Sequence, residues 1–134
     1  PARIAAEGAA IERGRVLIAP GNAHLGCIRS GNSVRATLLT HDVASRCRPS
    51  VDPMFDGVAG AYGVNAVGVV LSGMGRDGLE GAEALARAGG TVMVQDAASS
   101  AVWGMPGSVA RAGFASLVAT PQRLASAIAR RGVA

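Results

Sequence analysis

Two patterns of apolar residues alternate along the chain. Segments in which apolar residues recur at helical spacing predict helices, and the short, continuous apolar runs between them predict strands. We expect helices at 51–62, 79–88, 106–112 and from 121 onward, and strands at 66–71, 91–94 and 116–119. Strands that alternate with helices in this way predict an α/β domain built on a mostly parallel sheet. The run 66–71 has no polar alternation, so we expect it to be buried on both faces.

The first 50 residues have a different pattern. Residues 1–14 carry weak structural signals, and residues 15–20 form a short β-rich run. Residues 27–30 and 33–39 flank the turn pair Gly31-Asn32. This arrangement predicts a β-hairpin near the N-terminus.

Capping residues set the ends of the expected helices. Ser50 can cap the first helix, which Gly63 would end, and Gly89-Gly90 would stop the second. Thr120 and Pro121 open the last helix. Its expected buried face consists of Leu124, Ala125, Ile128 and Ala129.

Length and composition predict one domain with an aliphatic core. The chain has 134 residues, 49% of them hydrophobic and only 3% aromatic. No stretch approaches the roughly 20 apolar residues of a membrane span, and nothing resembles a signal peptide. Two cysteines suit a reduced compartment. We therefore expect a cytoplasmic protein without membrane insertion.

The distribution of charged and metal-ligating residues argues against nucleic acid and metal ions as ligands. The net charge is +4, but the basic residues, all of them arginine, are spread along the whole chain and few aromatic side chains accompany them. This pattern does not favour nucleic-acid binding. Two cysteines and two histidines are scattered without ligand spacing, so we expect no metal and no cofactor.

A glycine-rich loop follows the strand expected at 66–71 and admits three interpretations. The spacing Gly73-x-Gly75-x-x-Gly78 fits a dinucleotide-binding loop, with Asp96 as the later acid. Asp77 opposes that interpretation, because its carboxylate would face the pyrophosphate, at a cost of about 4 kcal/mol for each like-charge pair.

Asp77 has two further interpretations. With Glu80 three residues later, it has the form of a capping box, a purely structural role. Alternatively, it is an acid that orients a histidine, beside backbone amides exposed as oxyanion donors. Spacing alone does not decide between them.

Four motifs in order then indicate a family. They are IAPG at 18–21 with His24, RPSVD at 48–52, LSGMGRDG at 71–78 and VWGMP at 102–106. The sequence resembles the catalytic domain of the CheB family of chemotaxis receptor methylesterases, from about Ile11 to Ile128. The third and fourth motifs are specific together, although neither would be alone.

The resemblance implies a doubly wound α/β hydrolase with helices on both faces of its sheet. Such enzymes hydrolyse methyl esters of glutamate side chains on chemoreceptors, deamidate certain glutamines there, and use a Ser-His-Asp triad. It assigns Asp77 as the candidate catalytic acid and the Met74 backbone N–H as the candidate oxyanion donor. Asp77 would then meet an imidazole and not a phosphate. A receiver domain in the parent protein is left open as a further partner.

The chain departs from the family at its beginning. The family's serine and histidine precede the motif at 18–21, but none of the first 17 residues here is Ser or His. We therefore expect a single, incomplete domain, truncated on its N-terminal side and inactive in isolation. The alternatives are a catalytically inactive interaction module of the same fold and, remotely, a dinucleotide-binding domain.

The absent first part should also carry central strands of the sheet. The strand at 66–71, or its neighbour, would then expose an apolar edge that favours pairing with another chain. We consider two hypotheses: the chain completes its sheet by self-association, or it is the ordered remnant of a truncated protein.

Overall fold

Three parallel strands form the central sheet in the computed structural model, which describes residues 1–132. The strands are β5 (Val67–Val70), β6 (Thr91–Gln95) and β7 (Leu117–Ala119), in that spatial order. In their parallel register, Val69 lies beside Met93, and Met93 lies beside Leu117. The predicted parallel sheet is confirmed.

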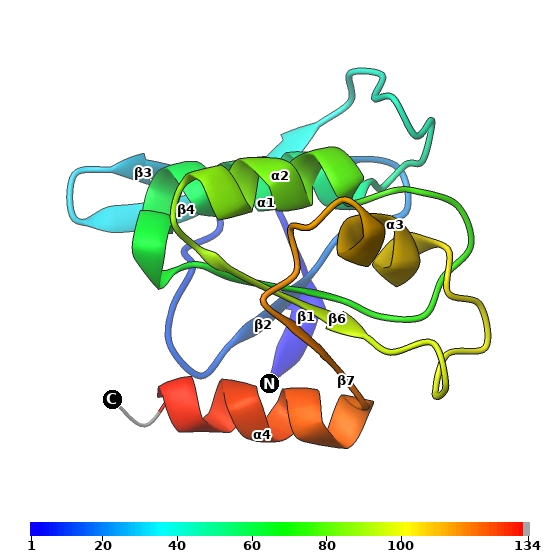
Figure 1. Cartoon of the computed structure of the whole chain (residues 1–134). Helices are drawn as coiled ribbons and strands as arrows, with labels where there is room; N and C mark the ends of the chain where they lie inside the picture. The colour runs from blue at the N-terminus through cyan, green and yellow to red at the C-terminus, as the bar shows by residue number, and fades with distance from the viewer. Residues whose placement is uncertain (133–134) are drawn as a thin grey trace.

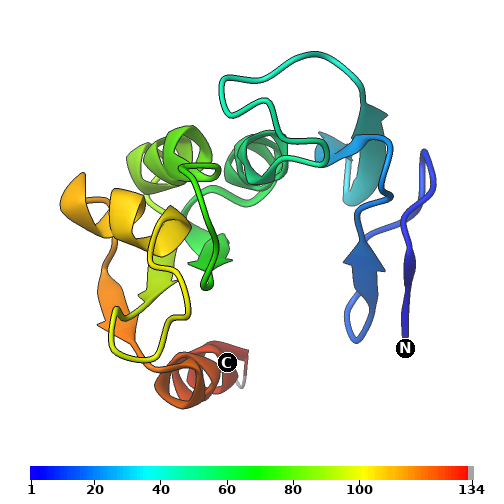
Figure 2. The same ribbon diagram turned by 90° about the vertical axis from the view of Figure 1, so that its right-hand side faces the viewer.

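Helices cover both faces of this sheet, as Figures 1 and 2 show. The helices are α1 (Val51–Tyr62), α2 (Leu79–Arg87), α3 (Met105–Arg111) and α4 (Pro121–Gly132), and a short 3-10 turn, η1 (Gly63–Asn65), follows α1. α1, α2 and α3 lie on one side, and α4 lies on the other. The predicted doubly wound architecture is therefore confirmed.

Alternation along β6 divides the core into two layers. Val92 and Val94 pack with residues of α1, α2 and α3, whereas Met93 packs with Leu124 of α4. β6 is therefore buried on both faces, because successive side chains of a strand point to opposite sides. β5 is less enclosed than we predicted: Val70 is buried, but Val69 is only half-buried and Leu71, just beyond the strand, is 52% exposed.

The N-terminal part forms two further pairs of strands. β3 (His24–Ser30) and β4 (Ser33–Leu39) make the predicted antiparallel hairpin, with Gly31 at the turn at φ 61°. The hairpin begins three residues earlier than the sequence indicated. β1 (Ala2–Ile4), which lies in the segment with weak signals, pairs in parallel with β2 (Val16–Ile18).

β5 has an unpaired edge within the part of the chain that the structure describes. It pairs with β6 only, and Figure 2 shows the β1–β2 pair standing apart on the β5 side of the sheet. Apolar side chains of that pair are exposed, among them Ile4, Val16 and Ile18. The expected apolar edge is therefore present at β5, and a second exposed strand pair lies on the same side.

The buried face expected for α4 is wrong in three of four positions. Leu124 is buried, but Ala125, Ile128 and Ala129 are exposed, and Ala127 is buried in their place. α4 meets the sheet mainly at β6 and β7, through a stripe formed by Leu124 and Ala127. None of the helices within residues 1–132 has the length and apolar character to cross a membrane.

Candidate functional site

Two loops meet at the carboxyl end of the sheet. The loop after β5 and the loop after β6 are joined by a bridge between Gly73 and Trp103. The Gly73 N–H donates to the Val102 carbonyl at 3.0 Å, and the Gly104 N–H donates to the Gly73 carbonyl at 3.1 Å. A Cβ at Gly104 would lie 2.8 Å from the Gly75 nitrogen, so this approach requires glycine. The motifs at 71–78 and 102–106 are therefore neighbours at the edge of the sheet where open α/β domains bind their ligands.

Gln95 fixes both loops, a role that the sequence analysis missed. Its buried Oε1 accepts the Ser72 N–H at 2.7 Å, and its Nε2 donates to the Ser99 carbonyl at 2.9 Å. Its backbone carbonyl accepts the Trp103 indole N–H at 2.7 Å. An amide at the carboxyl end of an apolar strand was the only sequence signal for this role.

Asp77 lies buried in the loop after β5, with only 5% of its surface exposed. Its Oδ1 accepts the Ser50 hydroxyl at 2.6 Å and the Ser45 hydroxyl at 2.7 Å. Its Oδ2 accepts the Val51 N–H at 2.8 Å. Two donors lie in the segment that leads into α1 and the third, Val51, is its first residue, so this carboxylate joins the loop after β5 to the start of that helix.

Hydrogen bonds keep Asp77 ionised. Burial by itself raises the pKa of the carboxyl group, but the donors from Ser50, Val51 and Ser45, helped by a contact with Asp52, outweigh burial and lower the pKa below its ordinary value. For Asp52 the balance is reversed. Burial, together with the charges of Asp77 and Glu80, raises the pKa of Asp52 despite the N–H of Gly81.

The capping-box interpretation of Asp77 and Glu80 is wrong. The N-cap of α2 is Gly78, at φ 96°, and no side chain caps it. The two helices exchange caps: Asp77, just before α2, accepts from the start of α1, and Asp52 of α1 accepts the Gly81 N–H of α2 at 2.8 Å. The Gly81 N–H at the start of α2, which a bound pyrophosphate would need as a donor, is therefore already bonded to the Asp52 carboxylate. This bond argues against the dinucleotide interpretation.

Met74 occupies the exposed crest of the same loop, with 81% of its surface exposed. Its N–H takes part in none of the hydrogen bonds within residues 1–132. A pocket of about 300 Å³ lies beside it, lined also by Ser45, Cys47, Asp52 and Arg76. Asp77 does not line this pocket, but it bonds to Ser45, which does. The two predicted site residues therefore lie in one loop without contacting each other through a hydrogen bond.

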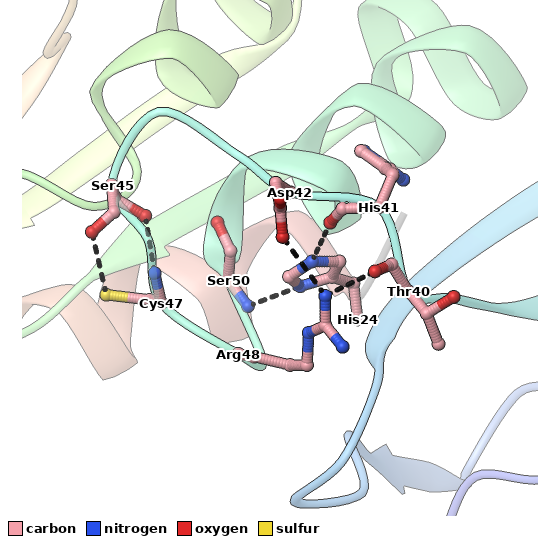
Figure 3. Close-up of polar contacts among 8 residues, drawn as sticks. All are labelled: His24, Thr40, His41, Asp42, Ser45, Cys47, Arg48 and Ser50. Carbon is pink, nitrogen blue, oxygen red and sulfur yellow. Dashed lines mark hydrogen bonds and ion pairs between the residues drawn. The ribbon is translucent and has the colours of Figure 1, made fainter.

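Neither histidine bonds to Asp77 in the described part of the chain. His24 is buried and fully paired: its Nδ1 accepts the Ser50 N–H at 3.0 Å, and its Nε2 donates to the His41 carbonyl at 2.8 Å (Figure 3). A second pocket, of about 460 Å³, is lined by both histidines with Arg46, Cys47 and Arg48. Within residues 1–132, no three His, Cys, Asp or Glu side chains gather in an arrangement that could hold a metal ion.

Comparisons with known proteins identify the family. A profile described as "CheB methylesterase" matches residues 1–128. A protein of Anaeromyxobacter dehalogenans, named protein-glutamate methylesterase/protein-glutamine glutaminase 3, is 50% identical over 129 residues, which are 96% of this chain and 37% of that protein. A relative of the same type from Trichodesmium erythraeum is 46% identical over 121 residues, which are 90% of this chain and 34% of that protein.

A solved structure gives the same result. The crystal structure of the CheB methylesterase catalytic domain of Thermotoga maritima superposes with a TM-score of 0.86 at 36% identity, covering 91% of this chain and 67% of that one. The chain spans about a third of the length of the curated relatives. The sequence match and the shared fold together show that this chain belongs to the CheB methylesterase family.

Proposed function

We propose that this chain supplies the acid and the oxyanion loop of a protein-glutamate methylesterase. Asp77 is the carboxylate of a Ser-His-Asp triad, and the Met74 N–H stabilises the oxyanion. The observation that carries this proposal is a buried Asp77, held by three hydrogen-bond donors, in the same loop as exposed Met74, whose N–H has no partner within residues 1–132. The names of the relatives, which are protein-glutamate methylesterases, give the substrate class.

The bonds of Asp77 leave it able to orient an imidazole. Within residues 1–132, Oδ1 receives two hydroxyl donors and Oδ2 receives one donor, the Val51 N–H, so Oδ2 can accept a second hydrogen bond. Because its pKa is lowered, the group is charged at neutral pH. A charged carboxylate holds the histidine in the required tautomer and stabilises the imidazolium that forms during the reaction.

The reaction follows from these roles. A serine hydroxyl attacks the ester carbonyl of a methylated glutamate, while the histidine takes its proton. The tetrahedral oxyanion accepts a hydrogen bond from Met74. The histidine returns the proton to the departing methoxide, which leaves as methanol, and water then hydrolyses the acyl-enzyme to a glutamate carboxylate. Deamidation of glutamine takes the same course with ammonia as the leaving group.

The serine and the histidine belong, in this proposal, to the part of the family domain that this chain does not span. The chain covers 67% of the Thermotoga catalytic domain. The open edge of β5 and the exposed β1–β2 pair on the same side support the docking of additional strands between them. Residues 1–134 are then one incomplete domain, and self-association through β5 is the competing way to cover that edge.

The proposed partners follow from the same assignment. The substrate is a methylated chemoreceptor, and a receiver domain in the parent protein is a further partner to be tested. The location that we propose for such an enzyme is the cytoplasm.

The test uses a fusion protein, the joined enzyme, in which the part of the Thermotoga catalytic domain that this chain does not cover is linked to this chain. Methanol release from a methylated chemoreceptor is measured. We expect Asp77→Asn to lower the rate by about 10⁴-fold, because the imidazole loses its orienting charge. Asp56→Asn is the matched control, since Asp56 is exposed on α1. The 134-residue chain alone should release no methanol.

Three results would contradict the proposal. Asp77→Asn could be as active as Asp56→Asn, or the 134 residues alone could turn over the receptor in a way that depends on Asp77. A joined protein that binds the receptor but releases no methanol would favour the inactive interaction module.

A further inference from the structure

A buried series of hydrogen bonds connects His24 to Asp77 through Ser50. The His24 Nδ1 accepts the Ser50 N–H at 3.0 Å, and the Ser50 hydroxyl donates to the Asp77 Oδ1 at 2.6 Å. All three residues are buried, His24 with only 1% of its surface exposed, so water does not compete for these bonds. Figure 3 shows the His24 ring between the two ends of the loop that carries the serines.

We propose that His24 is a positioning residue that acts through Ser50 on the Asp77 carboxylate. It lies outside the proposed triad and touches neither substrate nor reacting atoms. The expected effect of His24 on kcat rests on the proposed function. Its expected effect on the Asp77 carboxyl group rests on the geometry alone.

One ring holds both ends of the segment from 41 to 50. The His24 Nε2 donates to the carbonyl of His41 at the beginning, and the Nδ1 accepts the N–H of Ser50 at the end. Ser45 and Ser50 both lie in this segment, and they supply two of the three donors to Asp77. By holding both ends of the segment, the His24 ring fixes the positions of the Ser45 and Ser50 hydroxyls that donate to Asp77.

The Ser50 hydroxyl can donate in only one direction. It accepts the Asp52 N–H at 3.1 Å as the N-cap of α1, so its own hydrogen is free to point at Asp77. The Ser50 N–H donates to His24, so both the backbone N–H and the hydroxyl of Ser50 are engaged in this network. A shift of the Ser50 backbone would move the hydroxyl away from Asp77 and loosen the helix cap at the same time.

The partners of the ring also select its protonation. A backbone N–H donates to Nδ1, so Nδ1 carries no hydrogen, and the carbonyl at Nε2 can only accept, so Nε2 carries one. Only the neutral Nε2–H tautomer satisfies both partners. This requirement allows a pair of amide substitutions to separate the two bonds.

The experiment compares His24→Asn with His24→Gln. The Asn carbonyl can take the place of Nδ1 and accept from Ser50, whereas Gln reaches toward His41 and loses the bond to Ser50. The Asp77 carboxyl is titrated by carbon NMR in the 134-residue chain. In the joined enzyme, kcat and KM are measured for both variants.

We expect His24→Gln to raise the pH at which Asp77 titrates and to lower kcat by about tenfold at unchanged KM. His24→Asn should restore a titration close to that of the unsubstituted chain. A general loss of structure would affect both variants alike. Equal behaviour of the two variants, or an unchanged Asp77 titration with Gln, would overturn the inference.

A measurement on the unsubstituted chain does not depend on variants that fold. Nitrogen NMR of the His24 ring should show the Nε2–H tautomer and a coupling across the bond from the Ser50 amide to Nδ1. The Nδ1–H tautomer would overturn the inference. The two proposals also fail separately: if Asp77→Asn leaves the joined enzyme active, the proposed function fails, whereas equal His24 variants beside an inactive Asp77→Asn refute only the positioning role.

Discussion

Gly81 lies in the first turn of α2, directly against the backbone of α1. A Cβ placed there would be 2.7 Å from the Cβ of Phe55 and 3.0 Å from the Cα of Asp52. The Gly81 N–H also donates to the Asp52 Oδ1. Neither neighbouring atom belongs to the movable end of a side chain, so the two helices would have to separate to accept a methyl group.

The expected cost of Gly81→Ala follows from these contacts. Overpacking of this kind costs about 1–3 kcal/mol, and weakening the hydrogen bond to Asp52 adds about 1 kcal/mol. The higher helix propensity of alanine returns about 1 kcal/mol. We therefore expect a net loss of about 2 kcal/mol in the free energy of unfolding, although propensity alone predicts a gain.

Gly60→Ala in α1 is the matched control. Gly60 is exposed and helical, and a Cβ there meets no atom within 4 Å. This substitution should stabilise the chain by about 0.5–1 kcal/mol. Urea denaturation of the two variants and the unsubstituted chain measures both effects. If Gly81→Ala is as stable as Gly60→Ala, the close approach of α1 and α2 is wrong.

Three further predictions concern the site and the core. Asp77→Asn should lower the free energy of unfolding by about 2 kcal/mol at pH 7. Because the pKa of Asp77 in the folded chain lies below its ordinary value of 3.8, its stabilising effect is present above pH 3.8 and is lost as the pH falls through the folded pKa. The difference in stability between the two chains, measured by urea denaturation, should therefore disappear on acidification. Leu85→Ala should cost about 2–5 kcal/mol by the same assay, since Leu85 is fully buried, whereas exposed Leu71→Ala should stay within about 0.5 kcal/mol; equal costs would contradict the assigned core. Gln95→Leu should cost about 1–3 kcal/mol and speed hydrogen exchange at Ser72, which loses its buried acceptor; unchanged protection of that amide would contradict the role of Gln95.

The sequence by itself determined the elements that local chemistry controls. Ser50 caps α1 and Gly63 ends it, as their side-chain and backbone preferences predict. Gly31-Asn32 turns the hairpin, and the apolar run at 91–94 forms a strand, as predicted. These features depend on neighbours a few residues away, so the order of residue types is sufficient to predict them.

Only the tertiary structure decided which partners meet across long distances in the chain. Local spacing offered the cap of α2 as one role for Asp77, but its carboxylate accepts the N–H of Val51, the first residue of α1, 26 residues earlier. Gln95 likewise reaches Ser72, 23 residues earlier. On α4, the side that packs on the sheet contains Leu124 and Ala127, whereas Ile128 is exposed. A periodic pattern shows that a face is apolar, but the position of the neighbouring element determines which residues of it are buried.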